Sequence, residues 1–168
     1  MTRKTRIRAA LVTATALVTA ATVTAGVSAA GPEKSRSSEK PSKKQIAALF
    51  DGWNAALQTG DPDKVADRYA KDAVLLPTVS NKVRTDRVGI VDYFHHFLEN
   101  KPVGKKVQTI VNVLDSNSAI DTGVYEFTLT DPATQQKRVV EARYTYEYEK
   151  RGGTWLIVNH HSSAMPEG

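Results

Sequence analysis

The chain has 168 residues, of which 40% are hydrophobic, and its 23 basic and 18 acidic side chains give a formal net charge of +5. It contains no cysteine, which excludes disulfides, thiolate metal sites and cysteine nucleophiles. Nine basic residues precede residue 45, so residues 45–168 hold 14 basic against 16 acidic side chains, a balance that argues against a nucleic-acid-binding domain.

The first thirty residues have the pattern of a secretory signal peptide. Four of the first eight residues are basic, residues 9–27 form an uncharged run, and small residues then place a cleavage site near Ala29 or Ala30. The run is long enough to span a membrane but poor in Leu, Ile and Phe, which contribute most to membrane insertion. We therefore expect cleavage and an extracellular protein without a stable membrane anchor; an uncleaved anchor is the alternative.

Residues 31–42 contain Ser, Lys, Glu and Pro but no large apolar side chain, and this composition predicts a disordered linker. A single domain is expected over residues 43–166. It opens with a capping box of Ser42 and Gln45, which begins a helix that ends at Gly60. Asp61 caps a second, short helix that ends near Tyr69. A third helix is predicted over residues 87–100.

Strands fill most of the remaining chain. A short apolar strand is predicted over residues 73–77, and alternating patterns predict four more over residues 107–114, 120–130, 139–150 and 154–164. The last strands are longer than usual, which favours a strongly bent sheet. The sequence thus predicts an α+β fold in the order α-α-β-α-β-β-β-β. Three N-terminal helices pack on a bent, mostly antiparallel sheet to form a cone with a cavity at its wide end.

This pattern resembles the nuclear-transport-factor-2-like, or SnoaL-like, superfamily over residues 43–166. Within it, the chain is most similar to the association domain of calcium/calmodulin-dependent protein kinase II and its bacterial stand-alone relatives. The residues that carry the resemblance are Leu49 to Leu57, Gly60-Asp61, Tyr69, Asp72 to Leu75, Ile90, Tyr93-Phe94, and the ending Gly153-Thr154-Trp155, Ile157-Val158, His161 and Ser163.

The resemblance implies a fold and an assembly more than a reaction. The superfamily includes isomerases, cyclases, dehydratases, transport adaptors and oligomerisation modules, so the fold does not identify the chemistry. It implies a homodimer or a higher homo-oligomer, formed through the outer face of the sheet. Kinase activity is not implied, because the sequence has no Gly-rich phosphate loop and no catalytic-loop motif.

His161 is the first candidate for a catalytic group. Regular alternation along the last strand places it on one face with Trp155, Ile157, Asn159 and Ser163, beside the expected core. An imidazole titrates near neutral pH, so it can serve as a general base. The alternative is a structural histidine that bonds a backbone carbonyl and closes the sheet.

The strand before it offers two competing candidates on opposite faces. Tyr146 can stabilise an oxyanion from one face, and Arg143 can bind a carboxylate from the other. The sequence does not decide which face is concave, so the two are alternatives. The side chains expected to contact a ligand are Trp53, Tyr69, Tyr93, Tyr144 and Ser163.

We predict no metal and no cofactor. His95 and His96 diverge on a helix, and His160 and His161 point to opposite faces of a strand, so neither pair is expected to bind one ion alone. Two functions remain in competition. One is a secreted protein whose pocket binds a small, partly apolar molecule, with possible acid–base catalysis. The other is a non-catalytic association module.

Overall fold

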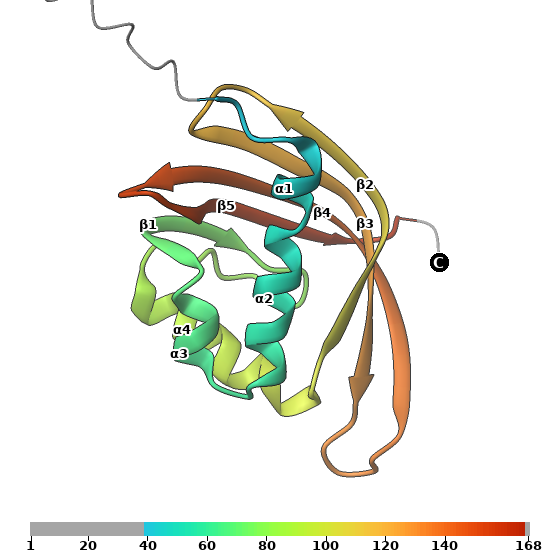
Figure 1. Ribbon diagram of the computed structural model, residues 1–168. Helices are drawn as coiled ribbons and strands as arrows, with labels where there is room; N and C mark the ends of the chain where they lie inside the picture. The colour runs from blue at the N-terminus through green and yellow to red at the C-terminus, as the bar shows by residue number, and fades with distance from the viewer. Residues whose placement is uncertain (1–38, 167–168) are drawn as a thin grey trace, which may run out of the picture. The chain divides into compact units, whose positions relative to one another are not determined.

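The computed structural model describes residues 39–166, so the predicted leader and most of the predicted linker lie outside the described residues. Within these bounds, helices cover the concave face of a strongly bent, five-stranded sheet (Figure 1). The predicted α+β cone is confirmed. No helix of residues 39–166 is both long and apolar enough to cross a membrane.

The helices form where the caps predict them. Ser42 Oγ accepts a bond from the Gln45 amide, and the Gln45 side chain accepts one from the Ser42 amide, which completes the predicted capping box. The predicted first helix is two segments that meet at Ala48. The helices are α1 (Lys43–Ala47), α2 (Leu49–Gln58), α3 (Pro62–Ala66), α4 (Arg87–Phe97) and the 3-10 turn η1 (Leu98–Asn100).

The sheet has the strand order β1-β5-β4-β3-β2. The strands are β1 (Tyr69–Leu76), β2 (Val103–Val113), β3 (Ser118–Thr130), β4 (Lys137–Arg151) and β5 (Thr154–Ala164). β1 pairs with β5 in parallel, and the other neighbours are antiparallel. β1 begins four residues earlier than predicted. In the chain, α1, α2 and α3 precede β1 and α4 follows it.

A β-bulge in β5 decides which side chains face inward. Asn159 lies opposite Glu147 and Ile157 lies opposite Tyr148, so β5 has one extra residue, Val158, at this point. Alternation therefore restarts after the bulge, and both Ile157 and His160 are buried. Regular alternation along β5, as predicted from the sequence, is wrong beyond Val158.

A second bulge lies in β2 at Val107, where the pairing with β3 shifts by one residue. Opposite it, the backbone of β3 comes so close that a Cβ atom on Gly123 would lie 2.0 Å from the Gln108 carbonyl oxygen. Only glycine fits this approach. The two bulges bend the long strands around the helices and so shape the cone.

The core is mainly aromatic. Trp53 of α2 lies at its centre, 5.5–6.1 Å between ring centroids from four neighbours of α4 and the sheet. These neighbours are Phe94, Phe127, Tyr146 and His160. Their edge-to-face packing fixes the distance between the helix layer and the sheet, which sets the depth of the cavity described next.

Candidate functional site

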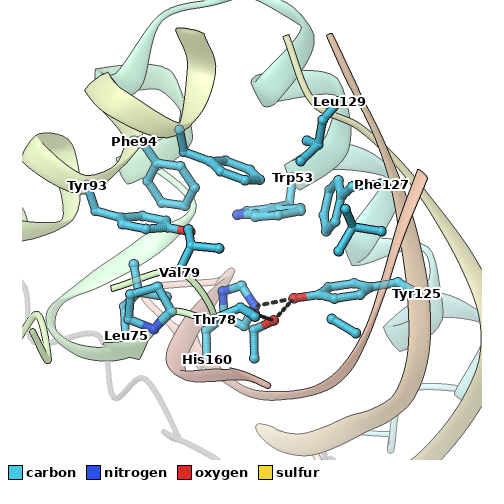
Figure 2. Close-up of a pocket in the computed structure, with 15 residues that line it drawn as sticks. Trp53, Leu75, Thr78, Val79, Tyr93, Phe94, Tyr125, Phe127, Leu129 and His160 are labelled. Carbon is cyan, nitrogen blue, oxygen red and sulfur yellow. Dashed lines mark hydrogen bonds between the residues drawn. The ribbon is translucent and has the colours of Figure 1, made fainter. Parts of the chain in front are cut away.

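A cavity of about 60 Å³ opens between α4 and the concave face of the sheet (Figure 2). This volume accommodates about four water-sized groups. Its walls are apolar and come from β1, α4, β3 and β4. They are Leu75, Phe94, Phe97, Phe127, Leu129 and Val140. Val79 and Tyr93 also line it, and Val79 is 71% exposed, which places this residue at the mouth.

Polar atoms gather at one corner of this apolar space. Thr78 comes from the loop after β1, Tyr125 from β3, and His160 and Ser162 from β5 (Figure 2). Tyr125, His160 and Ser162 are buried, and their polar atoms bond one another. The corner is therefore a defined hydrogen-bonding surface in an otherwise apolar cavity.

The direction of these hydrogen bonds is fixed from the core. The indole nitrogen of Trp53 donates to the Tyr69 hydroxyl at 3.1 Å, and an indole can only donate. The Tyr69 hydroxyl therefore uses its own proton to donate to His160 Nδ1, 2.8 Å away. Neutral His160 then carries its proton on Nε2, which faces the Tyr125 hydroxyl at 3.5 Å.

The same direction continues to the cavity. The Tyr125 hydroxyl donates to Ser162 Oγ at 2.5 Å. Ser162 Oγ also forms a very short contact with Thr78 Oγ1, in which either hydroxyl can donate; the direction that continues the chain has Ser162 donating. The Thr78 hydroxyl thus ends the chain as an acceptor from Ser162 and retains one proton. In this series of hydrogen bonds, Thr78 is the residue whose hydroxyl can donate to a molecule in the cavity.

The corner is electrically neutral at ordinary pH. Burial lowers the pKa of His160 to about 3, with a smaller contribution from neighbouring His161. Burial also raises the pKa of Tyr69 and of Tyr125. Among the described residues that line the cavity, none is Asp, Glu, Lys or Arg. The arrangement therefore suits hydrogen bonding to a neutral group rather than proton transfer near pH 7.

One surface cluster brings His95 and His96 together with a carboxylate. At the end of α4, their ring nitrogens and a Glu99 carboxylate oxygen all lie within 4.8 Å of one another. These three side chains could hold a metal ion. All three are exposed, and His96 pairs with Glu99 at 3.6 Å. Exposure leaves the cluster without the second layer of hydrogen bonds that orients ligands in dedicated metal sites.

Residues 42–166 match the model of the calcium/calmodulin dependent protein kinase II association domain. The chain belongs to this family. A solved protein from Xanthomonas campestris that is named for the same association domain is 57% identical, with a TM-score of 0.74. The match covers 79% of this chain and 96% of that one. Comparison with curated proteins gives no match.

More distant structures share the fold alone. A nuclear transport factor 2-like superfamily protein from Salmonella enterica is 16% identical with a TM-score of 0.62, over 75% of this chain and 96% of that one. A ketosteroid isomerase-like protein from Erwinia carotovora is also 16% identical, with a TM-score of 0.60, over 71% and 93% of the two chains. The predicted superfamily fold is thus confirmed.

Three predicted site residues of the association domain lie outside the cavity. His161, Arg143 and Ser163 lie together on the outer face of the sheet, where Arg143 Nε donates to Ser163 Oγ at 3.2 Å. His161 is exposed there, opposite Thr145. The prediction that His161 shares a face with Ile157 is wrong because of the bulge at Val158. Its catalytic role stays a prediction, without a contact to the cavity.

The predicted aromatic residues divide into cavity walls and supports. Trp53 and Tyr93 line the cavity. Tyr69 supports His160 from behind, as described above. Tyr146 stacks on His160 with 4.1 Å between ring centroids, and within residues 39–166 its hydroxyl has no hydrogen-bond partner. Tyr144 faces inward at the opposite end, where its hydroxyl donates to Asp121 at 3.0 Å.

Sequence reasoning missed Thr78, Tyr125, His160 and Ser162 as site residues. The polar ending of β5 was the right signal, but the bulge moved the inward positions by one residue, to His160 and Ser162. Alternating Tyr125, Phe127 and Leu129 could have indicated the inner face of β3, because all three are buried. Thr78 left no signal, since its loop has no periodic pattern.

Proposed function

We propose that this association domain binds a small molecule whose apolar, uncharged part fills the cavity and accepts a hydrogen bond from Thr78. The observation that carries the proposal is the hydrogen-bond chain that runs from Trp53 to Thr78 at the edge of an apolar cavity. A carbonyl or ether oxygen satisfies the terminal donor. A ligand group that can only donate would leave the Thr78 proton unpaired in a dry space, which costs about 1–3 kcal/mol.

The proposed role is binding without acid–base catalysis. General acid–base catalysis needs a group that titrates near the working pH. His160 has a pKa of about 3, and burial keeps the phenols at the cavity protonated. The cavity instead offers shape, apolar contact and one oriented donor, which together give selectivity for a ligand.

Pentan-2-one tests the pocket, because it pairs a carbonyl with a short apolar chain. We expect saturable NMR shifts of the cavity residues in the wild-type protein. Thr78→Val keeps the shape and removes the donor, so we expect binding to weaken about fivefold, in line with one hydrogen bond. Thr128→Val on the outer side of β3 is the matched control and should leave binding unchanged. Absence of any saturable shift at the cavity would refute the proposed pocket.

A second function, self-association, is supported by the outer face of the sheet. We define this face by the rows that cross β2 to β5, namely Gln108, Val124, Arg143 and Ser163, and Ile110, Thr122, Thr145 and His161. Ile110 is 50% exposed there, and Val103 and Val139 add exposed apolar surface at one end. The family match to an association domain supports a second copy of this chain as the occupant.

Ile110→Asp tests this assembly by placing a charge in the apolar part of the outer face. We expect the wild-type protein to be a dimer or larger by light scattering at micromolar concentration, and Ile110→Asp to shift it toward monomer, since an unpaired charge in an interface opposes association. Val88→Asp is the control, because Val88 is also apolar and exposed but lies on α4. A monomeric wild-type protein would contradict this proposal.

A further inference from the structure

Three side chains that can bind a metal ion meet at the junction of α4 and η1. His95 and His96 lie in the last turn of α4, and Glu99 lies in η1. One ligand atom from each lies within 4.8 Å of the other two, and no other group of this kind occurs in residues 39–166. None of the three lines the cavity or lies on a strand of the sheet. The cluster is therefore separate from the polar corner and from the outer face.

Glu99 brings the two histidines into one site because of its position in the chain. It follows His95 by four residues and His96 by three, and both spacings place side chains next to each other on a helix. The two imidazoles diverge as neighbours on a helix do, with ring centroids 5.4 Å apart and planes at 80°. They therefore approach the carboxylate from two sides, which makes a site that neither histidine pair forms alone.

The ligand atoms select the class of ion. Imidazole nitrogens together with a carboxylate oxygen favour Zn²⁺, Cu²⁺ or Ni²⁺ over Ca²⁺ and Mg²⁺, which prefer oxygen ligands alone. Zinc bonds of about 2.0–2.2 Å in a tetrahedral site place the ligand atoms about 3.3–3.6 Å apart. His96 Nδ1 and the Glu99 carboxylate already lie 3.6 Å apart. The remaining separations, at most 4.8 Å, need to shorten by about 1 Å, which exposed side chains achieve by rotation.

The surrounding charges permit a cation here. The carboxyl end of α4 is the negative end of the helix dipole, and Glu99 adds a full negative charge. Arg84 lines a groove with His96, but its guanidinium pairs with Asp92 at 3.3 Å, which offsets its charge. The three ligands are exposed, so binding removes little water from them. The same exposure leaves them mobile, and we therefore expect micromolar affinity rather than that of a buried structural site.

We propose that His95, His96 and Glu99 bind one divalent transition-metal ion of the class of Zn²⁺. Two imidazole nitrogens and one carboxylate oxygen hold the ion, and water fills the open position. The bound ion links α4 to η1, so it stabilises the folded protein as its concentration rises. This site is independent of both functions proposed above. The sequence-based prediction of no metal does not take Glu99 into account.

Titration of the untagged protein with ZnCl₂ tests the site by calorimetry in a buffer that does not bind metals. We expect one Zn²⁺ per chain with micromolar affinity, and no binding of Ca²⁺ or Mg²⁺ at the same concentrations. His96→Gln and Glu99→Gln should each weaken Zn²⁺ binding by about tenfold or more, because each removes a ligand. Zn²⁺ should also raise the melting temperature of the wild-type protein and leave that of His96→Gln nearly unchanged.

His161→Gln is the matched control. The chain has four histidines, and His160 is buried, so His161 is the remaining exposed imidazole outside the cluster. We expect His161→Gln to bind Zn²⁺ as the wild-type protein does. Equal weakening by His96→Gln and His161→Gln, or saturation only at millimolar Zn²⁺, would show adventitious surface binding and overturn the site. Full affinity in Glu99→Gln would overturn the set of three ligands.

Discussion

Lys106→Met is expected to lower the free energy of unfolding by about 3–5 kcal/mol, because it leaves a buried carboxylate without its counter-ion. Asp121 is 0% exposed, and Lys106 Nζ donates to it at 2.5 Å and to the Ala47 carbonyl at 2.9 Å. The ammonium also lies over the Phe50 and Tyr144 rings, 5.2 and 5.8 Å from their centroids. Urea denaturation measures the loss.

Lys106 and Asp121 differ in burial and in their other partners, so their substitutions should have different effects. Lys106 retains 14% side-chain exposure and the Ala47 carbonyl, so Asp121→Asn should cost less than Lys106→Met. The double variant should recover part of the loss, since a buried amide is cheaper than a buried, unpaired carboxylate. Lys105→Met is the control, because its pair with Glu126 is largely exposed and contributes at most about 1 kcal/mol. Equal losses from Lys105→Met and Lys106→Met would contradict this account.

Acid should destabilise the fold through His160 well above the pH at which carboxylates titrate. Burial lowers the pKa of His160 from 6.5 to about 3. Between these values the unfolded chain binds a proton that the folded protein does not, so stability falls as the pH falls. From pH 6.5 to pH 4.5 this one group should cost about 2 kcal/mol, an order-of-magnitude figure.

Urea denaturation at several pH values tests this with two adjacent histidines. His160→Gln should lower stability at pH 7, since the amide does not reproduce the stacking of the imidazole ring on Tyr146, but it should flatten the decline between pH 6.5 and 4.5. His161→Gln on the outer face should change the decline much less, because burial is the larger cause of the lowered His160 pKa. A wild-type protein whose stability is constant over this range would show that His160 is not held neutral by burial.

Much of the fold followed from local patterns. The capping box at Ser42, the cap at Asp61 and the alternating strands are decided by residues close together in the chain, and the structure confirms them. The break at Ala48 and the early start of β1 were not predicted, because both depend on packing. The parallel pairing of β1 with β5 was also missed, since it joins segments more than eighty residues apart.

The sequence by itself determined the class of fold, the superfamily and the presence of an aromatic core, because hydrophobic spacing and helix caps act over a few residues. Only the tertiary structure decided which polar residues of β5 face the cavity. One extra residue at Val158 reverses the faces after it, so His160 and Ser162 turn inward while His161 and Ser163 turn outward. Such a bulge depends on the pairing with β4 and on the bend of the sheet. Neither can be predicted from the residues next to Val158 in the sequence.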